Sequence, residues 1–157
     1  MTAAASPDSG RIENGEHHFR LRVYYEDTDA GGIVYHSNYL KYAERARTEM
    51  LRLTGIGQRD LLARDGLAFA VRSLSIDFLR PARLDDELAV RSRLTERGAA
   101  SMTILQRIVR ADGQSGDEED LTLLTVRVAC VRTDGRPTRI PAEVREGFAV
   151  FAPEAEF

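Results

Sequence analysis

The chain has 157 residues, of which 43% are hydrophobic and 30% are charged, and its formal net charge is −3. This length fits one domain of ordinary size, and the acidic balance argues against nucleic acid as a partner. A single cysteine, Cys130, excludes a disulfide framework and a cysteine-based metal site. No apolar run reaches the ~20 residues that cross a bilayer, and MTAAASPDSG is no secretory signal, so we expect a cytoplasmic protein.

The N-terminal part of the chain divides into a tail and the start of a domain. Residues 1–16 are small and polar, and we expect them to form a disordered tail ahead of one domain over 17–157. From His17 to Tyr25, apolar and polar side chains alternate, which predicts a strand with one face buried.

A loop and a long helix follow this strand. The loop is EDTDAGG, and after it apolar residues recur at helical spacing over 38–53, which predicts an amphipathic helix. Ser37 and Asn38 are suitable N-caps for this helix. Gly55 and Gly57 are expected to end it.

The remaining sequence predicts four strands in hairpin succession. They are LAFAVRSLSIDFL, ELAVRSRLTE, SMTILQRIVRA and LTLLTVRVACVRT. In the first of them the alternation slips near Arg72 and Ser73, which predicts a bulge. An acidic hairpin loop is expected over 112–120, and a short helix near 142–150. Adjacent strands pair antiparallel, so we predict an α+β domain whose long helix covers one face of the sheet.

The loop before the long helix combines two aspartates with two glycines. Gly31 and Gly32 let the backbone turn tightly and approach a ligand, while the helix start presents unpaired N–H groups that can stabilise an oxyanion. A carboxylate beside such donors suits attack on a carbonyl, directly or through water. These residues therefore indicate acyl transfer or hydrolysis. The alternative is that Asp27 and Asp29 only form turns.

A longer pattern resembles a known family. RVYYEDTDAGGIVYHSNYLKYAERARTEMLR, DFLRPARLDDEL and TILQRIV are similar to segments of the 4-hydroxybenzoyl-CoA thioesterase family of hot-dog proteins. The closest likeness is to the bacterial acyl-CoA thioesterase subfamily associated with the Tol–Pal cell-envelope system, and it extends from about residue 19 to residue 148. The resemblance implies a hot-dog fold, in which an antiparallel sheet wraps around one long central helix.

The resemblance also implies a site. The family's catalytic carboxylate corresponds to Asp29, acting as nucleophile or general base, and its carbonyl-polarising amide corresponds to the N–H of His36. Substrate-binding positions are expected at Gly31, Gly32 and Tyr35. No metal or redox cofactor is required. Asp27 is expected to shape the turn.

Other polar residues have two interpretations each. The His36 side chain could contact substrate or tune Asp29, or it could be a polar residue near the helix start. Some hot-dog thioesterases use a helix glutamate as base, but Glu44 is flanked by polar residues and is expected at the surface. Cys130 alternates with valines on one strand face, which predicts a buried, inert thiol.

The resemblance implies partners as well. The expected substrate is an acyl-CoA, and the expected assembly is a homodimer or homotetramer, with peripheral association with inner-membrane envelope proteins. Two other functions share parts of the pattern: a hot-dog dehydratase acting on hydroxyacyl thioesters, and a non-enzymatic acyl-thioester-binding scaffold. The sequence does not specify the acyl group.

Overall fold

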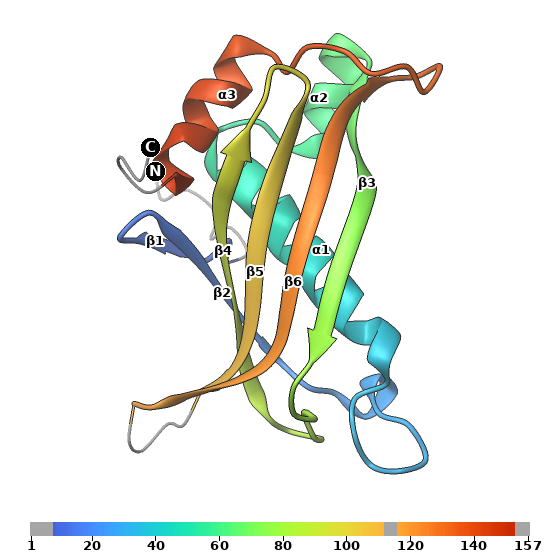
Figure 1. Ribbon diagram of the computed structural model, residues 1–157, viewed down its shortest axis with the longest axis vertical. Coiled ribbons are helices and arrows are strands. Elements are labelled where there is room, and N and C mark those ends of the chain that lie inside the picture. The colour runs from blue at the N-terminus through green and yellow to red at the C-terminus, as the bar shows by residue number, and fades with distance from the viewer. Residues whose placement is uncertain (1–7, 112–115, 153–157) are drawn as a thin grey trace, which may run out of the picture.

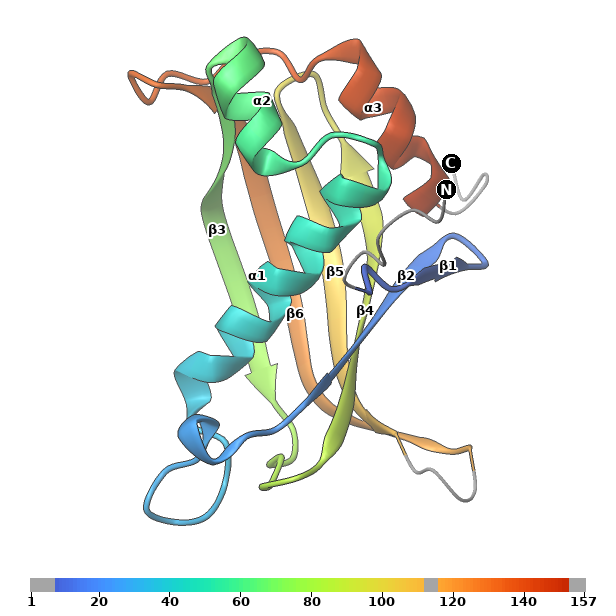
Figure 2. The ribbon, with the colours of Figure 1, turned by 180° about the vertical axis from the view of Figure 1, so that it is seen from behind.

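The computed structural model describes residues 8–111 and 116–152. Within these ranges six strands form one antiparallel sheet in the order β1-β2-β4-β5-β6-β3, and α1 lies across one face of it (Figures 1 and 2). The predicted α+β class and antiparallel pairing are confirmed. The strands are β1 Arg11–Glu13, β2 Glu16–Arg22, β3 Leu67–Phe78, β4 Glu87–Arg97, β5 Ser101–Ala111 and β6 Glu118–Arg132. The helices are α1 His36–Leu53, α2 Gln58–Asp65 and α3 Ala142–Phe148, with 3-10 turns at Tyr25–Asp27 and Ala149–Phe151.

Helix α1 forms because its apolar residues recur every three or four positions and therefore share one face. Tyr39, Ala43, Ala46 and Met50 on that face are buried against the sheet. The helix begins at His36, two residues before the predicted start. The prediction of a Ser37 or Asn38 cap is wrong. The N-cap is Tyr35, which makes no side-chain capping bond, and Asn38 is engaged elsewhere.

Strand β3 lies at the edge of the sheet and contains the predicted bulge. Val71 pairs with Val128 of β6 and Ser73 with Arg127, so Arg72 has no partner in the ladder. One extra residue restores the parity of the strand. Phe69, before the bulge, and Ile76, after it, therefore both pack against the same core.

The N-terminal hairpin differs from the sequence prediction. Residues 11–16 were expected in the disordered tail, but β1 pairs with β2 across a turn at Asn14 and Gly15. Both turn residues have positive φ, which asparagine and glycine tolerate. The short hairpin lacks the alternating apolar pattern that identifies longer strands. Residues 1–7 of the predicted tail lie outside the described residues.

The predicted acidic loop is shorter than expected. Residues 112–115 lie outside the described residues, and the three acids Glu118, Glu119 and Asp120 belong to β6. Each of the three carboxylates forms an ion pair with an arginine, which offsets the repulsion between neighbouring acids on the strand. The pairs are Arg91–Glu118, Arg80–Glu119 and Arg107–Asp120.

Helices α2 and α3 pack at one end of the sheet, and the loop before α1 lies at the other end (Figures 1 and 2). The predicted C-terminal helix is confirmed as α3. Helix α2 was not predicted. Among the helices of the described residues, none combines the length and the apolar character that a bilayer crossing requires.

Candidate active site

The loop between the first strand of the core and α1 is closed by its own backbone. Thr28 and Val34 form an isolated antiparallel bridge. Inside this bridge the N–H of Asp29 donates to the carbonyl of Ile33 at 2.9 Å, and the N–H of Gly32 donates to the carbonyl of Asp29 at 3.1 Å. Gly32 has a φ of +80°, a conformation that glycine adopts without steric cost. The loop therefore holds Asp29 in a fixed turn.

The two oxygens of the Asp29 carboxylate have different surroundings. Oδ1 accepts the N–H of Gly31 at 2.8 Å and, more weakly, the N–H of Ile33 at 3.4 Å. A Cβ at position 31 would lie 3.2 Å from this oxygen, so glycine gives the carboxylate its room. Within residues 8–111 and 116–152, Oδ2 has no hydrogen-bond partner, and the side chain is exposed. One oxygen orients the group, and the other is free for chemistry.

Asp27 ties the loop to its surroundings through its side chain and its backbone carbonyl. Its Oδ2 accepts the N–H of Tyr24 at 2.8 Å, which caps the 3-10 turn. Its carbonyl accepts the N–H of Tyr35 at 2.9 Å and the side-chain amide of Asn38 at 2.8 Å. These bonds tie the loop to the first turn of α1. The prediction that Asp27 shapes the turn is confirmed.

His36 is the first residue of α1. Its N–H is one of the donors that a helix start leaves without an intrahelical acceptor, and it finds no other acceptor in the described part of the chain. Its ring lies 4.3 Å from that of Tyr35 and 6.3 Å from that of Phe78, measured between centroids. The 18-residue helix adds a partial positive charge at this end. The N–H of His36 is thus available to a carbonyl oxygen.

A cavity of about 290 Å³ lies beside this helix start. The Tyr39 hydroxyl at its wall accepts the N–H of Ala82 at 3.0 Å. Burial raises the pKa of Tyr39. The lining is mostly apolar, as a site for an acyl thioester would require. It consists of Ile33, Val34, His36, Tyr39, Phe78, Leu79, Arg80 and Pro81.

The predicted site residues fall into two adjacent groups. Asp29, Gly31 and Gly32 lie in the loop, and Tyr35 and His36 lie at the start of α1. In the described ranges no hydrogen bond joins Asp29 to His36. Nor do three His, Cys, Asp or Glu side chains gather there in a group that could hold a metal ion.

The sequence analysis missed the far wall of the cavity. Phe78, Leu79 and Pro81 come from the end of β3 and the turn after it, more than 40 positions away along the chain. In the sequence these residues are marked only by the apolar pair Phe78 and Leu79 shortly before Pro81, in DFLRPARLDDEL. Such a pair is typical of many strand ends and does not by itself predict a cavity wall.

Two further predictions concern residues outside the loop. Glu44 is exposed on α1, as expected. Cys130 is a free cysteine buried in the core, so the predicted burial of its thiol is confirmed. Burial raises the pKa of this thiol, which disfavours the reactive thiolate.

An antiparallel sheet wrapped around one long central helix is the hot-dog fold of thioesterases. In agreement, the sequence profile of the Thioesterase-like superfamily matches residues 23–148, and the chain belongs to this superfamily. The acyl-CoA thioesterase YbgC of Haemophilus influenzae is 44% identical over 138 residues, which cover 87% of this chain and 96% of that protein. The acyl-CoA thioester hydrolase YbgC of Escherichia coli is 40% identical over 126 residues, covering 80% and 93%.

Solved structures show the same fold. A probable thioesterase from Bartonella henselae has a TM-score of 0.72 at 37% identity, covering 80% of this chain and 99% of that one. A 4-hydroxybenzoyl-CoA thioesterase complexed with 4-hydroxybenzoyl-CoA has a TM-score of 0.79 at 20% identity, covering 85% and 98%, and is a likeness of fold. The predicted family resemblance and the hot-dog fold are confirmed.

Proposed function

We propose that this chain hydrolyses acyl-CoA thioesters, with Asp29 acting at the reacting carbonyl carbon. One observation carries the proposal. Among the described residues, the loop presents a carboxylate oxygen without a hydrogen-bond partner, Oδ2 of Asp29, and seven residues later the start of α1 presents an N–H without an acceptor, that of His36. The curated relatives named above are acyl-CoA thioesterases, which supports the same reaction.

The proposed geometry assigns a role to each group. The thioester oxygen accepts a hydrogen bond from the N–H of His36, which stabilises the negative charge that develops there. Asp29 Oδ2 either removes a proton from an attacking water or attacks the carbonyl carbon itself. In both routes the C–S bond breaks and its electron pair leaves with CoA as the thiolate. In the second route a mixed anhydride forms on Asp29, and water then hydrolyses it to the free acid.

The remaining predicted residues support the same site. Gly31 gives the Asp29 carboxylate its room, and Gly32 leaves open space where the pantetheine arm would pass, since no atom lies within 4 Å of a Cβ built at Gly32. Tyr35 is half exposed at the rim and is proposed to contact substrate.

Replacing Asp29 by asparagine tests the proposal. Asparagine keeps an oxygen that can accept the N–H of Gly31, so the turn should persist, but it removes the charge. We expect kcat for thiol release from acyl-CoA to fall by about 10²-fold or more with little change in KM. Asp27→Asn is the matched control, because the Asp27 carboxylate caps the 3-10 turn and has no proposed role at the carbonyl. Equal activity of wild type and Asp29→Asn, or equal losses in both variants, would refute the role of Asp29.

We also propose that the chain assembles at least as a homodimer, and as a tetramer built from dimers. Strand β3 is an edge strand whose free backbone groups can pair with a second copy. The likeness to the subfamily associated with the Tol–Pal system additionally supports a cytoplasmic location and peripheral association with inner-membrane envelope proteins. A high-salt wash of the membrane fraction tests that association, and recovery only in the soluble fraction would count against it.

A further inference from the structure

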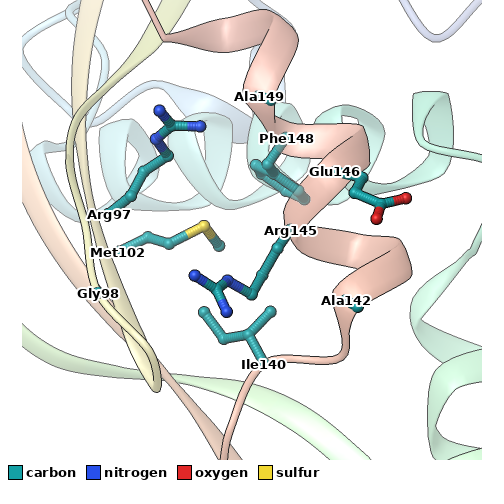
Figure 3. Close-up of a pocket in the computed structure, with 9 residues that line it drawn as sticks. All are labelled: Arg97, Gly98, Met102, Ile140, Ala142, Arg145, Glu146, Phe148 and Ala149. Carbon is teal, nitrogen blue, oxygen red and sulfur yellow. The ribbon is translucent and has the colours of Figure 1, made fainter.

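Two cavities meet behind the C-terminal half of α1. The first, here called the inner cavity, has a volume of about 200 Å³ and lies between α1, β3 and the centre of the sheet. The second, the outer cavity, has a volume of about 450 Å³ and lies between α3 and the turn that joins β4 to β5 (Figure 3). Met102 and Phe148 line both cavities. These two side chains therefore form the wall between them.

The two side chains of this wall differ in flexibility: Phe148 is held in place, whereas Met102 can adapt its shape. Met102 and Phe148 are each only 4% exposed. In Figure 3 the Met102 side chain extends from the sheet toward α3, where the Phe148 ring lies. Phe148 is held by an edge contact with Phe151, at 5.5 Å between centroids. Methionine is unbranched and adapts to different shapes, so Met102 is the part of the wall that a change in sequence would open most easily.

The helix side of the inner cavity is fixed by a buried polar network. Arg47 lines the cavity and donates to Oε1 of Gln106 at 2.9 Å. Gln106 is fully buried and donates in turn to the carbonyl of Ala43 and to the hydroxyl of Ser92, each at 3.0 Å. These bonds link Arg47 and the carbonyl of Ala43 on α1 to the centre of the sheet and hold this side of the cavity in place.

A single stripe of α1 connects the proposed site with the inner cavity. His36, at the proposed site, is followed on the same helix face by Leu40, Glu44, Arg47 and Leu51, at steps of three or four residues. The last three line the inner cavity. From His36 to Arg47 the helix rises about 16 Å, at ~1.5 Å per residue.

Strand β3 provides the facing side of this path. Phe78 lies beside His36, and Phe69 and Val71 line the inner cavity. Between them Leu74 is 39% exposed, and Leu40 on the helix is 37% exposed. These exposed apolar side chains of α1 and β3, here called the seam, lie between the start of α1 and the inner cavity, whose lining also includes the polar side chains of Glu44, Arg47 and Gln58.

We propose that the acyl chain of the substrate follows this seam into the inner cavity, and that Met102 and Phe148 set the longest chain that fits. This inference rests on the proposed thioesterase function and adds a determinant of acyl chain length. With the thioester carbonyl at the N–H of His36, the far end of the chain reaches the wall. Removing the wall joins the inner and outer cavities, and longer chains gain room.

The test measures kcat/KM of wild type and Met102→Ala over a series of saturated acyl-CoA substrates of increasing length. We expect the optimum of Met102→Ala to move to chains at least two methylene groups longer. For those chains kcat/KM should rise about tenfold over wild type, the value of burying two more methylene groups. Met102→Leu keeps the volume of the wall and should keep the wild-type profile.

Met50→Ala is the matched control, because Met50 is equally buried in α1 but lines neither cavity. It should leave the chain-length profile unchanged. If Met102→Ala does not fold, Phe148→Leu opens the same wall from the other side. A folded, active variant with an unchanged profile, or an equal change in Met50→Ala, would overturn the inference. Absence of thiol release by wild type from every acyl-CoA would instead overturn the proposed function on which the inference rests.

Discussion

At the scale of single residues, burial and backbone contacts separate two aspartates that the sequence presents as equals. Asp27 is partly buried, its Oδ2 accepts the Tyr24 amide, and its carbonyl accepts bonds from Tyr35 and Asn38 at the start of α1. Asp29 is exposed, and its Oδ1 accepts bonds only from within its own turn. A D-x-D pattern contains no information about which oxygens the backbone will occupy. The family resemblance favours Asp29 as the catalytic carboxylate, and the exposure of its side chain supports the proposed role.

A second residue, His17, should make stability depend on pH. Its ring is fully buried between Phe19 and Phe151, and its Nε2 lies 2.7 Å from the carbonyl of Ser9. Burial lowers the pKa of His17. The bond to Ser9 and the charges of Glu49 and Asp8 oppose this shift, while His18 reinforces it.

The sign follows from proton binding. Below about pH 6.5 the unfolded chain binds a proton on this histidine that the folded chain resists. The free energy of unfolding should therefore fall as pH decreases below about 6.5, by at most ~1.4 kcal/mol per pH unit. His17→Gln keeps a donor for Ser9 but cannot titrate. Thermal melts at about pH 7 and about pH 5.5 should show a smaller decrease for His17→Gln than for wild type, and equal decreases would contradict the role of His17.

At the scale of elements, the spacing of apolar residues along the sequence correctly predicted the long, regular helices and strands. The end of α1, the strands from β3 to β6, the bulge at Arg72 and the C-terminal helix all follow from the spacing of apolar residues. The missed elements are short: β1 has three residues and α2 has eight. The start of α1 was misplaced because its cap is backbone geometry at Tyr35 rather than a capping side chain.

The packing of α3 on α1 depends on a glycine. A Cβ at Gly147 would lie 2.5 Å from Cβ of Thr54, closer than such atoms approach in proteins. Alanine improves helix propensity by about 1 kcal/mol, but overpacking costs about 1–3 kcal/mol. We expect Gly147→Ala to lower the melting temperature, because α3 must move away from α1. Gly57→Ala is the control, since a Cβ there meets nothing closer than 3.9 Å, and it should be nearly neutral. Equal melting temperatures for both variants would show that α3 tolerates the shift.

At the scale of the whole molecule, one edge of the sheet is exposed. Strand β3 pairs with β6 on one side, and on its other side no described strand covers it. Val71, Leu74 and Phe78 leave apolar surface along this edge, next to the proposed acyl path. An exposed apolar edge strand is a site for pairing with another chain. Neither the sequence nor one copy of the fold shows what covers it, since a partner leaves no periodic signal in the chain it binds.

The homodimer can be tested at this edge. A stable dimer buries about 800 Å² on each partner, and a charge placed in its centre would be buried without a counter-ion, which is costly. We therefore expect Leu74→Glu to convert a wild-type dimer into monomers, measured by light scattering at micromolar concentration. Val150→Glu places the same charge on a residue of similar exposure far from β3, and it should leave the dimer intact. Monomeric wild type, or a dimer that survives Leu74→Glu, would show that β3 is not the interface.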